Sequence, residues 1–77
     1  MKNFSEMSKL SQEVAENIDE QLYDCKEDCK KGRLSGDMYE CVIRTVLNTM
    51  DNWTPRLKYA TRCEVLDWFQ SEYGLCL

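Results

Sequence analysis

Apolar residues recur every three or four positions along the first third of the chain. This stripe consists of Phe4, Met7, Leu10, Val14, Ile18, Leu22, Cys25 and Cys29. Such spacing places one apolar side chain per turn on the same face of an α-helix. Asn3 and Glu6 fit an N-terminal capping box, and Lys30-Lys31-Gly32 has the composition of a helix end. The pattern therefore predicts one continuous helix over about 4–31.

A second amphipathic segment follows after a short turn. Ser35 is suited to cap the N-terminus of a helix over about 36–51. Its predicted core positions are Tyr39, Val42, Ile43, Val46, Leu47 and Met50, with Met38 and Cys41 beside them. Because the connection is so short, the two helices should form an antiparallel hairpin.

The remaining residues predict one or two short helices. Thr54-Pro55 is a helix-start signal and predicts a helix over about 55–60. Thr61 with Glu64 three residues later fits another capping box, so we expect a break there and a final helix over about 62–73 that Gly74 ends. Its inner face should carry Leu66, Phe69 and Tyr73. The predicted fold is all-α, a three- or four-helix bundle formed by one domain, 1–77.

The length of the first predicted helix suggests a second chain. A helix of about 27 residues is about 40 Å long, whereas a globule of this size is roughly 30 Å across. The N-terminal part of the stripe should therefore overhang the chain's own core. We expect a homodimer in which these residues are covered, with an interface made by Phe4, Met7, Leu10 and Val14.

An acidic row runs along the opposite face of the same predicted helix. Its members are Glu13, Glu16, Glu20, Asp24 and Glu27. Residues 1–40 contain ten acidic and six basic residues, which accounts for the whole net charge of −4. This balance disfavours binding to nucleic acid and to anionic membranes. The row is either a solvated helix face or a surface that docks on a basic partner.

The five cysteines permit several kinds of site. Cys25, Cys29, Cys41 and Cys63 could supply four thiolates to a structural zinc ion, because the first two lie one turn apart and the third lies across the hairpin. A Cys25–Cys41 disulfide is an alternative. Core packing of reduced thiols is the favoured interpretation, since both cysteines of the first helix lie on its apolar stripe. No secretory signal is evident, so we expect a cytoplasmic protein.

Aromatic and basic residues are concentrated in the second half of the chain. Trp, Tyr and Arg are the residues that most often anchor protein interfaces. The candidates for such a role are Trp53, Arg56, Arg62 and Trp68. The alternative is that both tryptophans cover a small core, and of the neighbours Trp68 and Phe69 only one should point fully inward.

These features favour a binding function over catalysis. The chain has no histidine, and its three glycines are placed as helix punctuation rather than as a phosphate-binding loop. We therefore expect no enzyme activity and no cofactor. The expected function is a small module that docks on a larger protein and inhibits or regulates it. In type it resembles the small inhibitors that phages and mobile elements direct at host enzymes or defence systems. A helical domain with a structural zinc site, and a structural subunit or adaptor of a larger complex, are the alternatives.

Overall fold

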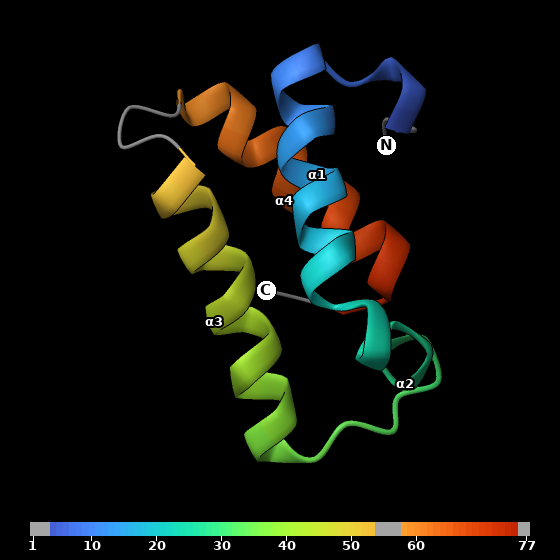
Figure 1. Cartoon of the computed structure of the whole chain (residues 1–77). Coiled ribbons are helices and arrows are strands. Elements are labelled where there is room, and N and C mark those ends of the chain that lie inside the picture. Colours follow the sequence, from blue (N-terminus) through green and yellow to red (C-terminus); the bar gives the residue numbers. More distant parts are fainter. Residues whose placement is uncertain (1–3, 54–57, 76–77) are drawn as a thin grey trace.

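All regular structure in residues 4–53 and 58–75, the part that the computed structural model describes, is helical. The elements are the 3₁₀-helix η1 (Phe4–Glu6), α1 (Lys9–Gln21), the 3₁₀-helix η2 (Tyr23–Cys25), α2 (Lys26–Lys30), α3 (Gly36–Trp53) and α4 (Tyr59–Tyr73). Helix α1 packs against both α3 and α4, and α3 runs antiparallel to α1 (Figure 1). The predicted all-α bundle and the antiparallel hairpin are confirmed. No helix within the described ranges is both long and apolar enough to cross a lipid bilayer.

The continuous helix predicted over about 4–31 is wrong, because the chain leaves the helical path at two places. The first is Ser8, which has extended backbone angles and caps α1 by accepting a hydrogen bond from the Ser11 backbone N–H at 3.3 Å. The Gln12 side chain also donates to the Met7 carbonyl oxygen at 3.0 Å. These bonds satisfy groups at a helix start, so the α-helix begins at Lys9 rather than near Asn3. Asn3 itself lies outside the described residues.

The second interruption is at Leu22. Its φ of −103° and ψ of 14° end α1, and the Cys25 N–H then donates to the Leu22 carbonyl oxygen in a 3₁₀ turn. Both breaks keep the folded chain compact. The molecule measures 31 × 24 × 19 Å, whereas an unbroken helix would be about 40 Å long. Breaking the helix turns the two ends of its apolar stripe toward one core.

The breaks remove the reason for a dimer through the N-terminal stripe. Met7 and Val14 are buried within the chain's own core, and Phe4 is partly buried against it. Leu10 is the most exposed of the four predicted interface residues. Most of the predicted interface set Phe4, Met7, Leu10 and Val14 therefore has cover within the chain, and a homodimer through these residues stays a prediction.

Three predicted helix signals are confirmed. The Ser35 hydroxyl accepts from the Met38 N–H at 3.3 Å and so caps the start of α3. Gly32, with φ of +66°, follows α2, and the Arg33 N–H donates back to the Asp28 carbonyl oxygen at 2.9 Å. Gly74, with φ of +68°, ends α4. A left-handed residue at these positions lets the last carbonyls of each helix find donors.

The break predicted near Thr61 is wrong. Helix α4 is continuous from Tyr59 to Tyr73, with Lys58 at its N-cap. Glu64, which we expected to close a local capping box, instead accepts a hydrogen bond from the Ser8 N–H at 2.8 Å. The carboxylate thus supplies the missing acceptor at the start of α1, 56 residues away. The predicted start at Thr54-Pro55 lies outside the described residues.

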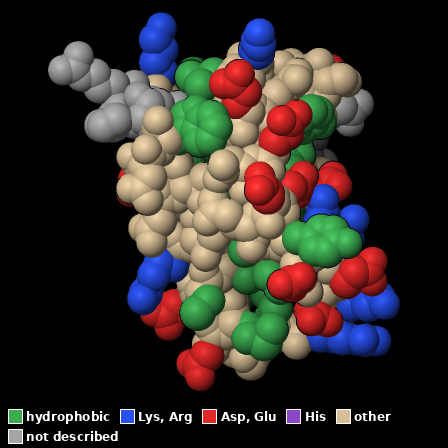
Figure 2. Space-filling view, in the orientation of Figure 1, with side chains coloured by type: hydrophobic (Ala, Val, Ile, Leu, Met, Phe, Trp, Pro, Cys, Tyr) green, Lys and Arg blue, Asp and Glu red, His purple; other side chains and the backbone are tan. Residues whose placement is uncertain are grey.

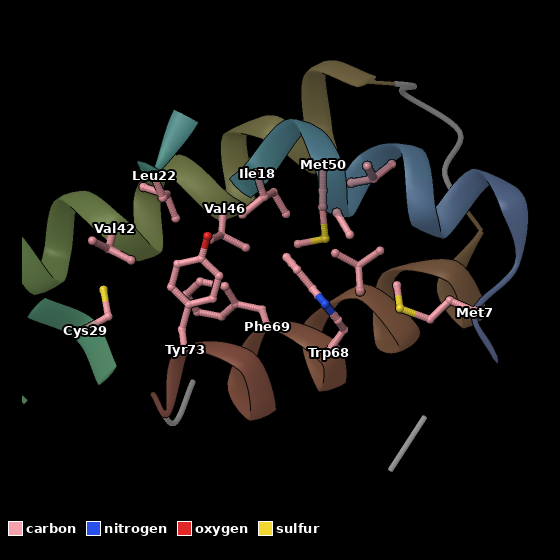
Figure 3. Packing of buried hydrophobic residues seen from close by; sticks show 13 residues of the cluster. Met7, Ile18, Leu22, Cys29, Val42, Val46, Met50, Trp68, Phe69 and Tyr73 are labelled. Carbon is pink, nitrogen blue, oxygen red and sulfur yellow. The ribbon is translucent and has the colours of Figure 1, made fainter. Parts of the chain in front are cut away.

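Helix α4 inserts three aromatic side chains into the core. Figure 3 shows Trp68, Phe69 and Tyr73 pointing from α4 into the core formed with α1 and α3. Trp68 is only 5 % exposed and Phe69 is fully buried, so the expectation that only one of them would point fully inward is wrong. Tyr73 stacks on Phe69 with ring centroids 4.7 Å apart and meets Trp68 edge to face at 6.0 Å. This arrangement suits the quadrupoles of aromatic rings.

A polar cluster at Tyr73 joins three helices. The fully buried Tyr73 donates its hydroxyl to the Asp19 carboxylate on α1 at 2.6 Å. Lys26 of α2 bridges Asp19 at 3.1 Å and Glu72 at 3.3 Å, and its ammonium lies 5.1 Å from the centre of the Tyr73 ring. Burial, the hydrogen bond and the negative charge of Asp19 raise the pKa of Tyr73 well above its usual range. The cluster fixes α2 and α4 at the break that ends α1.

We predict that Tyr73→Phe lowers the free energy of unfolding by about 1.5–3 kcal/mol, because it removes a buried hydrogen bond to a charged group. Urea denaturation at neutral pH measures the change. Tyr23→Phe deletes the same atom from an exposed ring and should leave stability within about 0.5 kcal/mol of the original. Equal losses in the two variants would contradict a special role for Tyr73.

Candidate protein-binding site

An open hollow of about 430 Å³ lies between α1 and the end of α3. Its lining residues are Glu13, Glu16, Asn17, Glu20 and Trp53. The three glutamates are exposed and belong to one face of α1, and the Trp53 side chain is 39 % exposed. The hollow therefore combines two features that the sequence placed on separate surfaces, the acidic row and a candidate aromatic anchor.

The antiparallel register of α1 and α3 explains this combination. Gln21 donates its side-chain amide to the Thr49 hydroxyl at 2.8 Å, which fixes one point of contact between the helices. Trp53 lies one turn beyond Thr49, and Asn17 lies one turn before Gln21. Because the helices run in opposite directions, these two residues also meet, and Trp53 comes to the middle of the acidic row.

A second hollow of about 370 Å³ continues from the first along the same helix pair. Its lining consists of Asn17, Gln21, Thr45, Asn48, Thr49, Asn52 and Trp53. Asn17 and Trp53 belong to both hollows, so together they form one surface, which we call the α1–α3 groove. Primary amides both donate and accept hydrogen bonds, so they can satisfy the backbone of a bound polypeptide. These amides are not among the binding residues predicted from the sequence, although Asn48 and Asn52 lie one helical turn apart.

The acidic end of the groove has unneutralised charge. Glu27, Glu40 and Glu72 each form an ion pair with a lysine or arginine. Glu13, Glu16 and Glu20 form no ion pair with any residue that the structure describes. Figure 2 shows several acidic side chains along the middle of the face on which α1 lies, whereas the basic side chains stand mostly around its periphery. Three adjacent carboxylates attract cations, and the face of an indole ring adds to that attraction.

Other residues predicted to bind a partner lie elsewhere. Asp24 and Glu27 follow the break at Leu22, so they are exposed but do not line the groove. Arg62 forms an ion pair with Asp51 at 2.9 Å. Trp68 is a core residue and not an exposed anchor. The predicted tryptophan–arginine patch therefore lacks one of its two tryptophans, and Arg56 lies outside the described residues.

The four cysteines of the alternative zinc interpretation do not gather at one place. Cys29 is buried and interacts with Cys25, whereas Cys63 interacts with Tyr59 on α4. Cys25 and Cys41 line a separate apolar groove of about 280 Å³, together with Leu22, Asp37, Met38, Val42 and Thr45. Both thiols are free. Within residues 4–53 and 58–75, no three side chains of the types that bind metals come together. The four-thiolate set is thus not assembled, and core packing accounts for Cys29.

We predict that Cys29 is far less reactive than Cys41 toward iodoacetamide. Burial and the nearby Cys25 raise the pKa of Cys29 to about 11, so little thiolate is present near neutral pH, while Cys41 is exposed. At pH 8, Cys41 should be alkylated at least about tenfold faster, as followed by mass spectrometry of proteolytic peptides. Raising the pH should accelerate the reaction of Cys29. Equal rates at pH 8 would show that Cys29 is not held in the core.

The comparison with known proteins does not identify the function of this site. No family model, curated protein or solved structure matches the chain.

Proposed function

We propose that the protein is a non-catalytic binding module that docks on a basic segment of a larger protein through the α1–α3 groove. In this proposal it inhibits or regulates that protein by occupying its surface, as small proteins of phages and mobile elements do to host enzymes or defence systems. The proposal places it in the cytoplasm, where its cysteines would stay reduced. The observation that carries the proposal is the hollow that Glu13, Glu16 and Glu20 line together with Trp53.

The groove is chemically suited to a lysine- or arginine-containing segment. Its carboxylates have no ion-pair partner among the described residues, so binding a cation there displaces no such partner. The indole of Trp53 offers a flat surface for the stem or the charged group of the same side chain. The adjoining amides can then bind the main chain of the partner on either side of the basic residue.

The open shape of the groove favours binding of a partner over catalysis of a reaction. Both hollows are open to solvent, whereas many active sites exclude water from the reacting groups. The charges of an open groove chiefly accelerate association and select the sign of the partner, and an aromatic anchor at its centre slows dissociation.

We predict that Glu13→Lys, Glu16→Lys and Glu20→Lys in one chain weaken partner binding at least about tenfold while leaving the helix content unchanged. The matched control carries Asp24→Lys, Glu27→Lys and Asp67→Lys, which change the net charge equally outside the groove. Both variants and the original chain are used as bait to capture the partner from the native cell. Affinity for the purified partner is then measured at several salt concentrations, and circular dichroism checks the fold.

The control distinguishes a local site from a general charge effect. If the groove binds the partner, only the first variant loses affinity, and the original affinity falls as salt is raised. If both variants lose affinity equally, net charge and not the groove determines binding. If neither does, the glutamates are a solvated helix face.

A further inference from the structure

Helix α3 carries a partly exposed apolar row beside its buried face, and Ile43 in this row also packs against the core. Helix α3 packs chiefly against α1, and it buries Val42, Val46, Thr49 and Met50. Tyr39, Ile43 and Leu47 follow one another at intervals of four on an adjoining side, where they line a shallow groove. We predicted all three as core residues, yet Leu47 remains 39 % exposed and Tyr39 is similarly accessible. Figure 1 shows the reason, since α3 stands at one edge of the molecule.

Two opposite charges border this row. Glu40 and Arg44 line the same groove and form an ion pair at 2.8 Å, one turn apart on the helix. When a second α3 runs antiparallel across a two-fold axis near Ile43, Glu40 of one copy comes beside Arg44 of the other, and the reverse pair forms as well. A parallel arrangement would instead place like charges together. The charge pattern is therefore self-complementary for antiparallel pairing alone.

We propose that α3 pairs antiparallel with α3 of a second copy of this chain, with Ile43 near the centre of the interface, Leu47 of each copy beside Tyr39 of the other, and Glu40–Arg44 pairs across its edge. This surface differs from the α1–α3 groove, so the proposal does not depend on the proposed function. It moves the expected homodimer from the N-terminal stripe to α3. A single helix face offers a small contact surface, so we expect a weak dimer with a dissociation constant on the order of tens to hundreds of micromolar.

The first experiment is sedimentation equilibrium of the full chain from micromolar to millimolar concentration. We expect the original protein to change reversibly from the monomer mass to the dimer mass. Leu47→Glu should raise the dissociation constant about tenfold or more, because each dimer buries two copies of this side chain. Met38→Glu is the matched control, since Met38 lies on the same helix, is 42 % exposed, and lines a different groove. It should leave the dissociation constant within about twofold.

A charge-exchange experiment tests the antiparallel register. Glu40→Arg alone places two bases at the interface of each copy, and Arg44→Glu alone places two acids there. Each variant by itself should therefore dimerise more weakly than the original chain, by about tenfold, whereas an equimolar mixture should recover a dimer. Differently tagged copies in native mass spectrometry identify the mixed species, and circular dichroism confirms that each variant folds.

Three results would overturn the proposal. These are a monomer at every concentration tested, equal weakening by Leu47→Glu and Met38→Glu, or a mixture that dimerises no better than its components. A monomer that binds an unrelated protein through Leu47 would assign this face to that partner instead of to a second copy. The variant with Glu13→Lys, Glu16→Lys and Glu20→Lys tests only the α1–α3 groove. Its result does not alter the dimerisation measurements, so the two proposals fail independently.

Discussion

The fold depends on how Tyr73 reaches from the end of α4 to α1. Its ring is buried against Phe69 and Trp68, and its hydroxyl donates to Asp19. A buried phenol needs such an acceptor, and the acceptor in turn holds Lys26 at the start of α2. One side chain thus joins the last helix to both sides of the break at Leu22. This contact helps to hold α2 against α1 and α4.

The interruption of the first helix also determines what the acidic row can do. In one unbroken helix, the five carboxylates of the acidic row would continue along a single face. The break leaves Glu13, Glu16 and Glu20 on α1, directly opposite the end of α3, and turns Glu27 onto α2, where it pairs with Lys31. The antiparallel register then brings Trp53 into the shorter row. The break at Leu22 allows apolar side chains on both of its sides to be buried. It also leaves three carboxylates close to the exposed indole of Trp53.

Helix α3 has more apolar surface than one neighbour can cover. Its groove with α1 is polar at Asn52, whereas Ile43 and Leu47 line a neighbouring groove, and Asn48 lies on the border between the two. A small chain has few helices with which to cover every apolar face, so surplus apolar surface is common in small domains and can be used for association. The two proposed contacts use different sides of α3. A second copy on one side would leave the acidic groove on the other side accessible to a larger protein.

The sequence alone determined the helical class, the antiparallel hairpin and the helix ends at Gly32, Ser35 and Gly74, because each depends on local periodicity or on hydrogen bonds within a few residues. It also identified Glu13, Glu16, Glu20 and Trp53 as candidates for binding, but not that they share one hollow. Only the tertiary structure decided where the first helix breaks, since Ser8 is capped partly by the distant Glu64. It likewise decided that Trp68 points inward and Leu47 outward. Periodicity defines the apolar side of a helix, but only the positions of neighbouring helices determine how much of that side is covered.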